Sequence, residues 1–109
     1  MTNFIQIGTT AGSRSEAEKI SRTLVERRLA ACVQILGPIT STYWWEGKIE
    51  QSEEFLCLIK TRGDKYSAVE TAIKEVHSYK VPEILAVPIA FGSSDYIDWV
   101  AKELSEGTR

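Results

Sequence analysis

The stretch from Ile39 to Thr61 reads ITSTYWWEGKIEQSEEFLCLIKT, and it predicts a β-hairpin. Its two ends, residues 39–45 and 55–61, are rich in the β-branched and aromatic residues that favour strands. Between them, Glu46-Gly47 is a tight-turn signal, because glycine readily adopts the positive φ that such turns require. This segment therefore provides two antiparallel strands around which the rest of the chain can be placed.

The residues before the hairpin predict one more strand and a helix. Phe4–Thr9 is β-branched and apolar, as a short buried strand is. The capping box Ser13-x-x-Glu16 then starts a helix that we expect over residues 14–28. The first strand of the hairpin begins at Ala31, and Gly37-Pro38 interrupts it, so we expect an extended but irregular strand there.

The residues after the hairpin predict a helix, a strand and a closing helix. Asp64 is the expected N-cap of the first of these helices, and the Pro82 segment ends it. Ile84–Phe91 predicts the fourth strand. Ser93 or Ser94 then caps the closing helix, whose apolar residues recur at helical spacing.

The element order predicts an α+β, ferredoxin-like fold: a βαββαβ antiparallel sheet with an extra C-terminal helix and an extended hairpin between strands two and three. Right-handed crossovers put strands one and three in the centre of the sheet. Pro38 and Pro88 fall in strands two and four, the expected edges, where a missing N–H is tolerated. Residues 1–109 are expected to form a single domain.

Composition argues against two classes of partner. The net charge is -2 and the pI is about 5.4, whereas nucleic-acid binding depends on clustered lysine and arginine. No apolar run reaches the length of a membrane span, and Met1–Phe4 does not resemble a signal peptide. We therefore expect a cytoplasmic protein that binds neither nucleic acid nor membrane.

Both faces of the predicted sheet are apolar, which indicates an oligomer. In strand three, Leu56 and Leu58 point to one face, whereas Cys57 and Ile59 point to the other. Soluble monomers seldom expose large apolar patches, so we expect a second copy to cover the outer face. The alternative is that the closing helix folds back over it. The residues expected at the interface between copies are Trp44, Trp45 and Pro88.

His77, the only histidine, is the candidate metal ligand or acid–base group, with Glu83 or Cys32 as partners. The alternative is that its side chain caps the last carbonyls of the preceding helix. Cys32 and Cys57 are predicted to lie about four residues out of register, too far apart for a disulfide. We expect both thiols to be reduced and buried.

Enzyme signatures are weak. The loop Gly8–Arg14 joins a strand to a helix N-terminus, as the phosphate loop of acylphosphatases does on this type of fold. Such enzymes also use an asparagine to place water, and the only asparagine here is Asn3, before the first strand. No nucleophile, phosphate-loop or dinucleotide motif is present. We therefore expect a protein without catalytic activity.

Several segments together resemble the CutA divalent-cation tolerance family. They are Leu29-Ala30-Ala31-Cys32-Val33, Ser41-Thr42-Tyr43-Trp44-Trp45-Glu46-Gly47-Lys48, Lys60-Thr61, His77-Ser78-Tyr79 and Pro82-Glu83-Ile84, with Tyr96 and Trp99 in the closing helix. The match covers nearly the whole chain in order. The resemblance implies a homotrimer built like PII signalling proteins, with strands paired between subunits, and a link to copper and other divalent metals.

The metal-binding residues of that family are only partly present. Bacterial members discussed for copper binding carry a cysteine near the end of strand one and a second histidine before the histidine of the motif. Gly8 and Val76 stand at those places here, and Ser78 and Lys80 also differ from the usual residues.

Two hypotheses follow from the residues and the resemblance. The first is a non-enzymatic, homotrimeric protein of divalent-metal tolerance without a tightly bound cofactor, which binds copper or another divalent ion weakly at His77, with Glu83 or Cys32 nearby. The second is a PII-like regulatory module that binds a small anionic ligand in a cleft between subunits. Tyr43, Trp45 and Lys60 are the residues expected to line that cleft.

Overall fold

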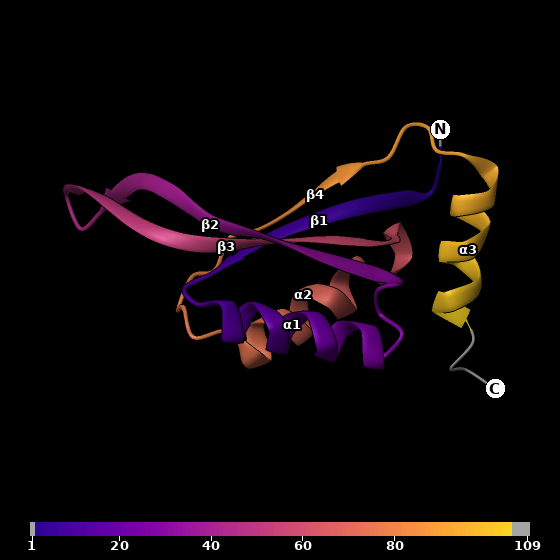
Figure 1. Ribbon diagram of the computed structural model, residues 1–109, viewed down its shortest axis with the longest axis horizontal. Helices are drawn as coiled ribbons and strands as arrows, with labels where there is room; N and C mark the ends of the chain where they lie inside the picture. Colours follow the sequence, from indigo (N-terminus) through magenta and orange to yellow (C-terminus); the bar gives the residue numbers. More distant parts are fainter. Residues whose placement is uncertain (1, 106–109) are drawn as a thin grey trace.

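The computed structural model describes residues 2–105, which form a four-stranded antiparallel sheet and three α-helices (Figure 1). Helices α1 and α2 lie under one face of the sheet, whereas α3 stands at one end of it. No helix within residues 2–105 has both the length and the apolar character to cross a membrane. In chain order the elements are β1 (Phe4–Ala11), α1 (Arg14–Glu26), β2 (Cys32–Trp45), β3 (Lys48–Arg62), the 3₁₀ turn η1 (Gly63–Lys65), α2 (Tyr66–Val76), β4 (Ile84–Pro88) and α3 (Ser94–Ser105).

The strand order is β2-β3-β1-β4, which confirms the predicted ferredoxin-like topology. Strands β1 and β3 are central, and the proline-containing strands β2 and β4 are the edges. The core lies between the sheet and the helices α1 and α2, where each fully buried aliphatic side chain contributes about 1.5–3 kcal/mol. Its largest fully buried members include Ile7, Ile59, Ile20, Leu24 and Ile73.

A bulge in β2 corrects the predicted register of the hairpin. Leu36 lies opposite Leu56, but Ile39 lies opposite Glu54, so Gly37 and Pro38 together face one residue of β3. A side chain at Gly37 would come within 2.5 Å of the Phe55 ring, which explains the glycine. The extra residue shifts the rest of β2 by one position relative to a regular hairpin.

Because of this shift, Cys32 lies opposite Lys60 rather than residue 61. Residues directly opposite each other share a face of the sheet, so Cys32 lies on the outer face and is only partly buried. The expectation that both cysteines are buried was therefore wrong for Cys32. It was correct for Cys57, which points into the core and is 0% exposed.

Two helix boundaries also differ from the prediction. Helix α1 ends at Glu26 rather than residue 28, because Arg28 has a φ of 59°, which no α-helix continues. Asp64 is not the N-cap of α2; it belongs to η1 and pairs with Arg62 at 2.7 Å. The Ser13 cap is as predicted, since its Oγ accepts the Glu16 N–H at 3.1 Å.

Strand β4 is shorter than predicted and ends at Pro88 instead of residue 91. Its neighbour β1 begins at Phe4, whose carbonyl still accepts the Ile89 N–H at 3.0 Å. Beyond that point β1 offers no partner, and the chain turns toward α3. Ser93 caps that helix, because its Oγ accepts the Tyr96 N–H at 3.4 Å.

The outer face of the sheet remains largely uncovered in a single chain. Helix α3 buries Val100 and Leu104 at one end, but Leu85 and Val87 on β4 stay 64% and 54% exposed. The alternative in which the closing helix covers the whole face is therefore wrong. The hairpin also projects past β1, whose last residue, Ala11, pairs with Phe55 (Figure 1).

Candidate functional site

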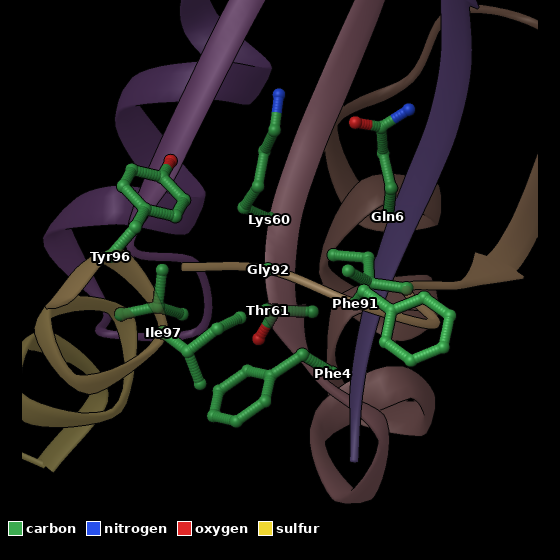
Figure 2. Close-up of a pocket in the computed structure, with 10 residues that line it drawn as sticks. Phe4, Gln6, Lys60, Thr61, Phe91, Gly92, Tyr96 and Ile97 are labelled. Carbon is green, nitrogen blue, oxygen red and sulfur yellow. The ribbon is translucent and has the colours of Figure 1, made fainter. Parts of the chain in front are cut away.

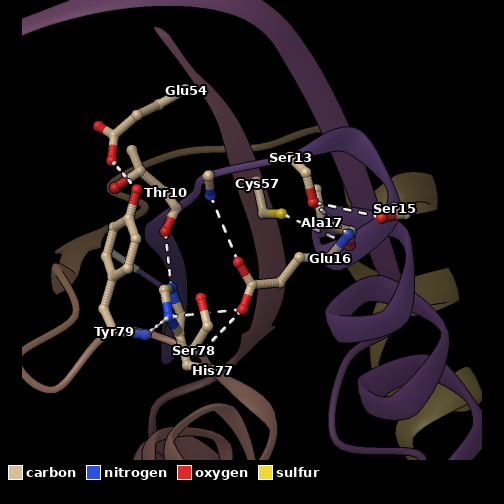
Figure 3. Close-up of polar contacts among 11 residues, drawn as sticks. Thr10, Ser13, Ser15, Glu16, Ala17, Glu54, Cys57, His77, Ser78 and Tyr79 are labelled. Carbon is tan, nitrogen blue, oxygen red and sulfur yellow. Dashed lines mark hydrogen bonds and ion pairs between the residues drawn. The ribbon is translucent and has the colours of Figure 1, made fainter. Parts of the chain in front are cut away.

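His77 is the residue directly after α2, and its side chain is fully buried. Its Nε2 lies 2.7 Å from the carbonyl oxygen of Thr10, and its Nδ1 accepts the Tyr79 N–H at 3.0 Å (Figure 3). Because a backbone N–H can only donate and a carbonyl can only accept, the proton of the neutral ring is on Nε2. Both ring nitrogens are therefore occupied within the chain.

Glu16, in the first turn of α1, is the acidic neighbour of this histidine. Its Oε2 accepts the Ser78 N–H at 2.6 Å and lies 3.9 Å from His77 Nδ1, and its Oε1 accepts the Gly12 N–H at 3.4 Å. Burial raises the pKa of this carboxyl, but the hydrogen bonds from Ser78 and Gly12 and the electrostatic effect of the nearby His77 together outweigh burial and lower the pKa below its ordinary value. The ionised Glu16 side chain thus links the turn before α1, at Gly12, to the turn after α2, at Ser78.

Tyr79 extends the same cluster to the base of the hairpin. Its hydroxyl donates to Glu54 Oε2 at 2.8 Å, and its ring centroid lies 4.8 Å from that of His77. Glu54 is only 6% exposed. Burial and the Glu54 carboxylate raise the pKa of Tyr79 to about 12. A side chain at Gly12 would come within 3.1 Å of the hydroxyl, so the glycine leaves room for it.

We call these residues, Thr10, Glu16, Glu54, His77 and Tyr79, the His77 cluster. It connects the end of β1, the start of α1, the turn after α2 and the base of the hairpin (Figure 3). The side chain of His77 thus bonds to a neighbouring strand, so the alternative in which it caps the last carbonyls of α2 was wrong. With its polar atoms paired in this way, the cluster fixes these segments relative to one another, and a ligand at either nitrogen of His77 must displace a hydrogen bond.

The other predicted metal ligands do not lie beside His77 in one chain. Glu83 is exposed and makes no hydrogen bond or ion pair with His77 within residues 2–105. Cys32 lies opposite Lys60, whose partner on β1 is four positions from Thr10, or roughly 13 Å along the strand. In that described range no group of three or more His, Cys, Asp or Glu side chains is placed to hold a metal ion.

The predicted ligand-cleft residues are also separated within one chain. Tyr43 lies opposite Glu50 near the hairpin tip, ten residues of β3 away from Lys60, which is roughly 33 Å of extended strand. Trp45 lies still closer to the tip. A cleft that contains all three residues therefore needs a second copy of the chain.

The predicted interface residues are all on the surface of the single chain. Trp44 is 71% exposed, Trp45 is 54% exposed, and Pro88 on edge strand β4 is exposed. Ile49 lies opposite Trp44 and is 63% exposed, so the projecting hairpin has an apolar surface that no part of the described chain covers.

Sequence reasoning missed four members of the His77 cluster as partners of the histidine. Glu16 carried a usable signal, since the capping box fixed its place in the first helical turn. Tyr79 had a weaker one, two residues after His77. Thr10 and Glu54 had none, because their role depends on tertiary packing alone.

Comparison with known proteins gives consistent matches over almost the whole chain. Residues 5–103 match the family model of the CutA1 divalent ion tolerance protein. The chain is 49% identical to the "Divalent-cation tolerance protein CutA" of Archaeoglobus fulgidus over 92% of this chain and 95% of that protein. The crystal structure of CutA from Xylella fastidiosa superposes with a TM-score of 0.92 at 40% identity, covering 94% of this chain and 99% of the other.

The solved structure of the Archaeoglobus fulgidus protein has a TM-score of 0.91 at 44% identity, covering 93% of this chain and 98% of that one. It is described as a periplasmic divalent cation tolerance protein. The cytoplasmic location expected from the sequence of the present chain therefore stays a prediction.

Proposed function

The chain belongs to the CutA1 divalent ion tolerance family, and from that premise we propose that it is a non-enzymatic divalent-cation tolerance protein that works as a homotrimer and binds copper or a similar divalent ion weakly. The relatives named above support the role in tolerance. The weak affinity and the association of copies rest on the geometry of this chain, and the number three rests on the family resemblance.

The observation that carries the weak affinity is the state of His77. A metal ion at Nδ1 would displace the Tyr79 N–H, and one at Nε2 would leave the Thr10 carbonyl without its donor. Each lost bond to a buried polar group costs about 1–3 kcal/mol. The residues of one chain thus do not fit a preformed tight site.

When a metal does bind, we place it at His77 with Glu16, whose carboxylate is 3.9 Å from Nδ1, as the nearest acidic group. Cys32 lies roughly 13 Å along the sheet from Thr10, so we propose that it takes part only if another copy supplies it. We propose the same for Glu83, which makes no hydrogen bond or ion pair with His77 within residues 2–105. The expected dissociation constant is on the order of micromolar or weaker, which corresponds to about 8 kcal/mol or less.

Association of copies is supported by three exposed features of the single chain. These are the open apolar face of the sheet, the unpaired outer edges of β2 and β4, and the hairpin with Trp44 and Trp45. An edge strand that projects beyond its own sheet is a ready partner for the edge of another. We propose that three copies bury these surfaces together.

Calorimetry with tag-free protein and Cu(II), together with native mass spectrometry, tests the proposal. The expected mass is three times 12.2 kDa. Copper binding should be lost in His77→Ala and in His77→Gln, while the trimer persists. The glutamine variant is the sharper one, because its amide can still donate to Thr10 and accept from Tyr79. Glu18→Gln, at an exposed position of α1, is the matched control and should leave copper binding unchanged, whereas Glu83→Gln and Cys32→Ser test whether another copy supplies a ligand. Nanomolar binding that survives both His77 variants would contradict the proposal, as would a folded monomer.

A further inference from the structure

A cavity of about 240 Å³ opens where α3 meets the outer face of the sheet (Figure 2). The side chains that form it come from three parts of the chain: Phe4 and Gln6 on β1, Lys60 on β3, and Phe91, Tyr96 and Ile97 in the turn before α3 and its first turns. We call it the α3 cavity. Gln6 lies directly opposite the exposed Val87 of β4, so the cavity belongs to the face that we propose to be covered by a neighbouring copy.

The apolar wall of the α3 cavity is incomplete in a single chain. Figure 2 shows the rings of Phe4 and Phe91 with Ile97 on one side of the cavity. Phe91 is 86% exposed, more than any other large hydrophobic residue within residues 2–105. Because burial of a phenyl ring is strongly favourable, this exposure indicates a contact with an apolar group from outside the chain.

Trp45 is a large apolar side chain that points to the same face as the cavity. It lies opposite Lys48, and Lys48 and Lys60 are an even number of residues apart on the unbroken strand β3. Since side chains alternate between the two faces of a strand, Trp45, Lys48 and Lys60 all point outward. Trp44, opposite Ile49, points to the other face of the hairpin.

The Trp45 indole cannot reach the α3 cavity of its own chain. Lys48, beside Trp45, and Lys60, beside the cavity, are separated by roughly 40 Å of extended strand. The hairpin tip and α3 accordingly lie at opposite ends of the molecule (Figure 1). Only another copy can bring a tryptophan of the hairpin to this cavity.

The size and chemistry of the α3 cavity fit an indole ring. An engineered apolar cavity of about 150 Å³ accommodates benzene, and indole has half as many heavy atoms again, so it needs roughly 225 Å³. The α3 cavity provides about 240 Å³. Indole is apolar apart from one N–H, which can only donate. The polar side of the cavity offers two acceptors, the Gln6 amide oxygen and the Tyr96 hydroxyl oxygen.

Charge does not oppose the insertion. Lys60 is the one charged side chain among the described residues that line the cavity, and its ammonium group donates to Gln34 Oε1. The exposed residues beside Trp45 on the same face of the hairpin are Lys48 and Glu50, whose charges are opposite. This part of the hairpin therefore brings no net charge toward Lys60.

We propose that Trp45 of one copy inserts its indole ring into the α3 cavity of a neighbouring copy, where the ring packs against Phe91 and Phe4 and its N–H faces the polar side. The contact buries the ring of Phe91, which a single chain leaves exposed. The inference rests on the proposed association of copies and names a contact that holds two of them together. The α3 cavity is thus occupied by protein in the assembly.

A double-mutant cycle between Trp45 and Phe91 tests this contact in the intact oligomer. Trp45→Leu, Phe91→Leu and the double variant are unfolded in guanidinium chloride at one fixed protein concentration. Side chains at opposite ends of one chain should act additively. A contact between copies should instead leave the double variant at least about twofold more stable, in its unfolding equilibrium constant, than the two single variants together predict.

Trp44→Leu combined with Phe91→Leu is the matched control. Trp44 is the neighbour of Trp45 and is 71% exposed, but it points to the other face of the hairpin. Its loss and that of Phe91 should therefore be additive. Native mass spectrometry at the same protein concentration shows whether each variant is still an oligomer.

Tryptophan fluorescence is a second measurement, which does not depend on stability. Trp44→Phe with Trp99→Phe leaves Trp45 as the only tryptophan. Adding Phe91→Leu should move its emission maximum to longer wavelength, because the indole loses part of its apolar surroundings. In the companion variant Trp45→Phe with Trp99→Phe, which keeps only Trp44, Phe91→Leu should leave the emission unchanged.

Additive losses for Trp45 and Phe91 in a protein that is still an oligomer would overturn this inference and leave the proposed assembly intact. An emission of Trp45 that does not respond to Phe91→Leu would overturn it as well. Coupling of Phe91 to Trp44 instead would show that the other face of the hairpin fills the cavity. A folded monomer in native mass spectrometry would contradict the assembly itself, and this contact with it.

Discussion

Two polar regions lie along β1, and they differ in how many of their polar atoms have hydrogen-bond partners. At the C-terminal end of the strand, the His77 cluster pairs both nitrogens of the imidazole and both oxygens of the Glu16 carboxylate. Toward the N-terminal end, Lys60 carries a charge whose described partner is a single amide oxygen, that of Gln34.

The difference separates a paired buried network from a charged group that has protons left to donate. A fully paired buried network fixes the arrangement of the chain, and any ligand must first break bonds to reach it. A charged group with spare donors gains from a ligand without such a loss. The only histidine is the conspicuous residue in the sequence, but both of its ring nitrogens already have partners, whereas the Lys60 ammonium group has protons to donate beyond its bond to Gln34.

The largest test of this comparison is the stability of two single variants. His77→Ala should lower the free energy of unfolding by about 3 kcal/mol, because it leaves a cavity and removes the partners of Thr10 and Tyr79. Lys60→Met should lower it by less than about 0.5 kcal/mol. Urea unfolding at one fixed protein concentration measures both. If the two losses are equal, His77 contributes no more to the stability of the fold than Lys60 does.

A smaller effect is expected for Tyr79→Phe. At neutral pH it should cost about 1–2 kcal/mol, because the buried Glu54 carboxylate loses the hydroxyl that donates to it. The pKa of Tyr79 is raised from 10.0 to about 12, so the protonated phenol stabilises the fold fully below pH 10. That contribution is lost as the pH rises from 10 to 12, and wild type and variant should converge there.

Tyr43→Phe is the matched control for this experiment. The Tyr43 hydroxyl also has a hydrogen-bond partner, Ser52 at 3.1 Å, but it lies on the exposed hairpin. Its removal should change stability by less than about 0.5 kcal/mol at any pH. A phenol that titrates near pH 12 in wild type and disappears from the ultraviolet titration of Tyr79→Phe would identify the group directly.

The sequence was sufficient for the order of elements and for the two exposed edges. Hydrophobic patterning, the Glu46-Gly47 turn and the two strand prolines are local signals, and the topology follows from them with general rules of handedness. The register was off by one position at Cys32, because the Gly37-Pro38 signal marks an interruption without stating how many residues of β2 face β3.

The site was less predictable, for a physical reason. His77 was identified as noteworthy, but its partners come from β1 and α1, more than sixty residues earlier in the chain. At the start of α3, Phe4, Lys60 and Tyr96 likewise come together from three separate elements (Figure 2). Spacing along the chain carries no information about such contacts, whereas Ser13 and Glu16, three residues apart, could be paired from the sequence alone.

The smallest expected effect is the pH dependence that Glu16 contributes. Burial raises the pKa of its carboxyl, but the hydrogen bonds from Ser78 and the proximity of His77 lower it below the ordinary value of 4.5 overall. A carboxyl whose pKa is lower in the folded state stabilises the fold above pH 4.5, and this contribution is lost as the pH falls through the folded-state pKa. Glu16→Gln should therefore be less stable than wild type at pH 7, and the two should converge below pH 4.5. Glu18→Gln, an exposed position on the same helix, is the matched control and should follow wild type at every pH. Urea midpoints between pH 3 and pH 7 measure the difference. A Glu16→Gln curve that runs parallel to wild type over this range would mean that the His77 cluster does not stabilise the Glu16 carboxylate. The contrast between a fully paired cluster and Lys60 would then be wrong.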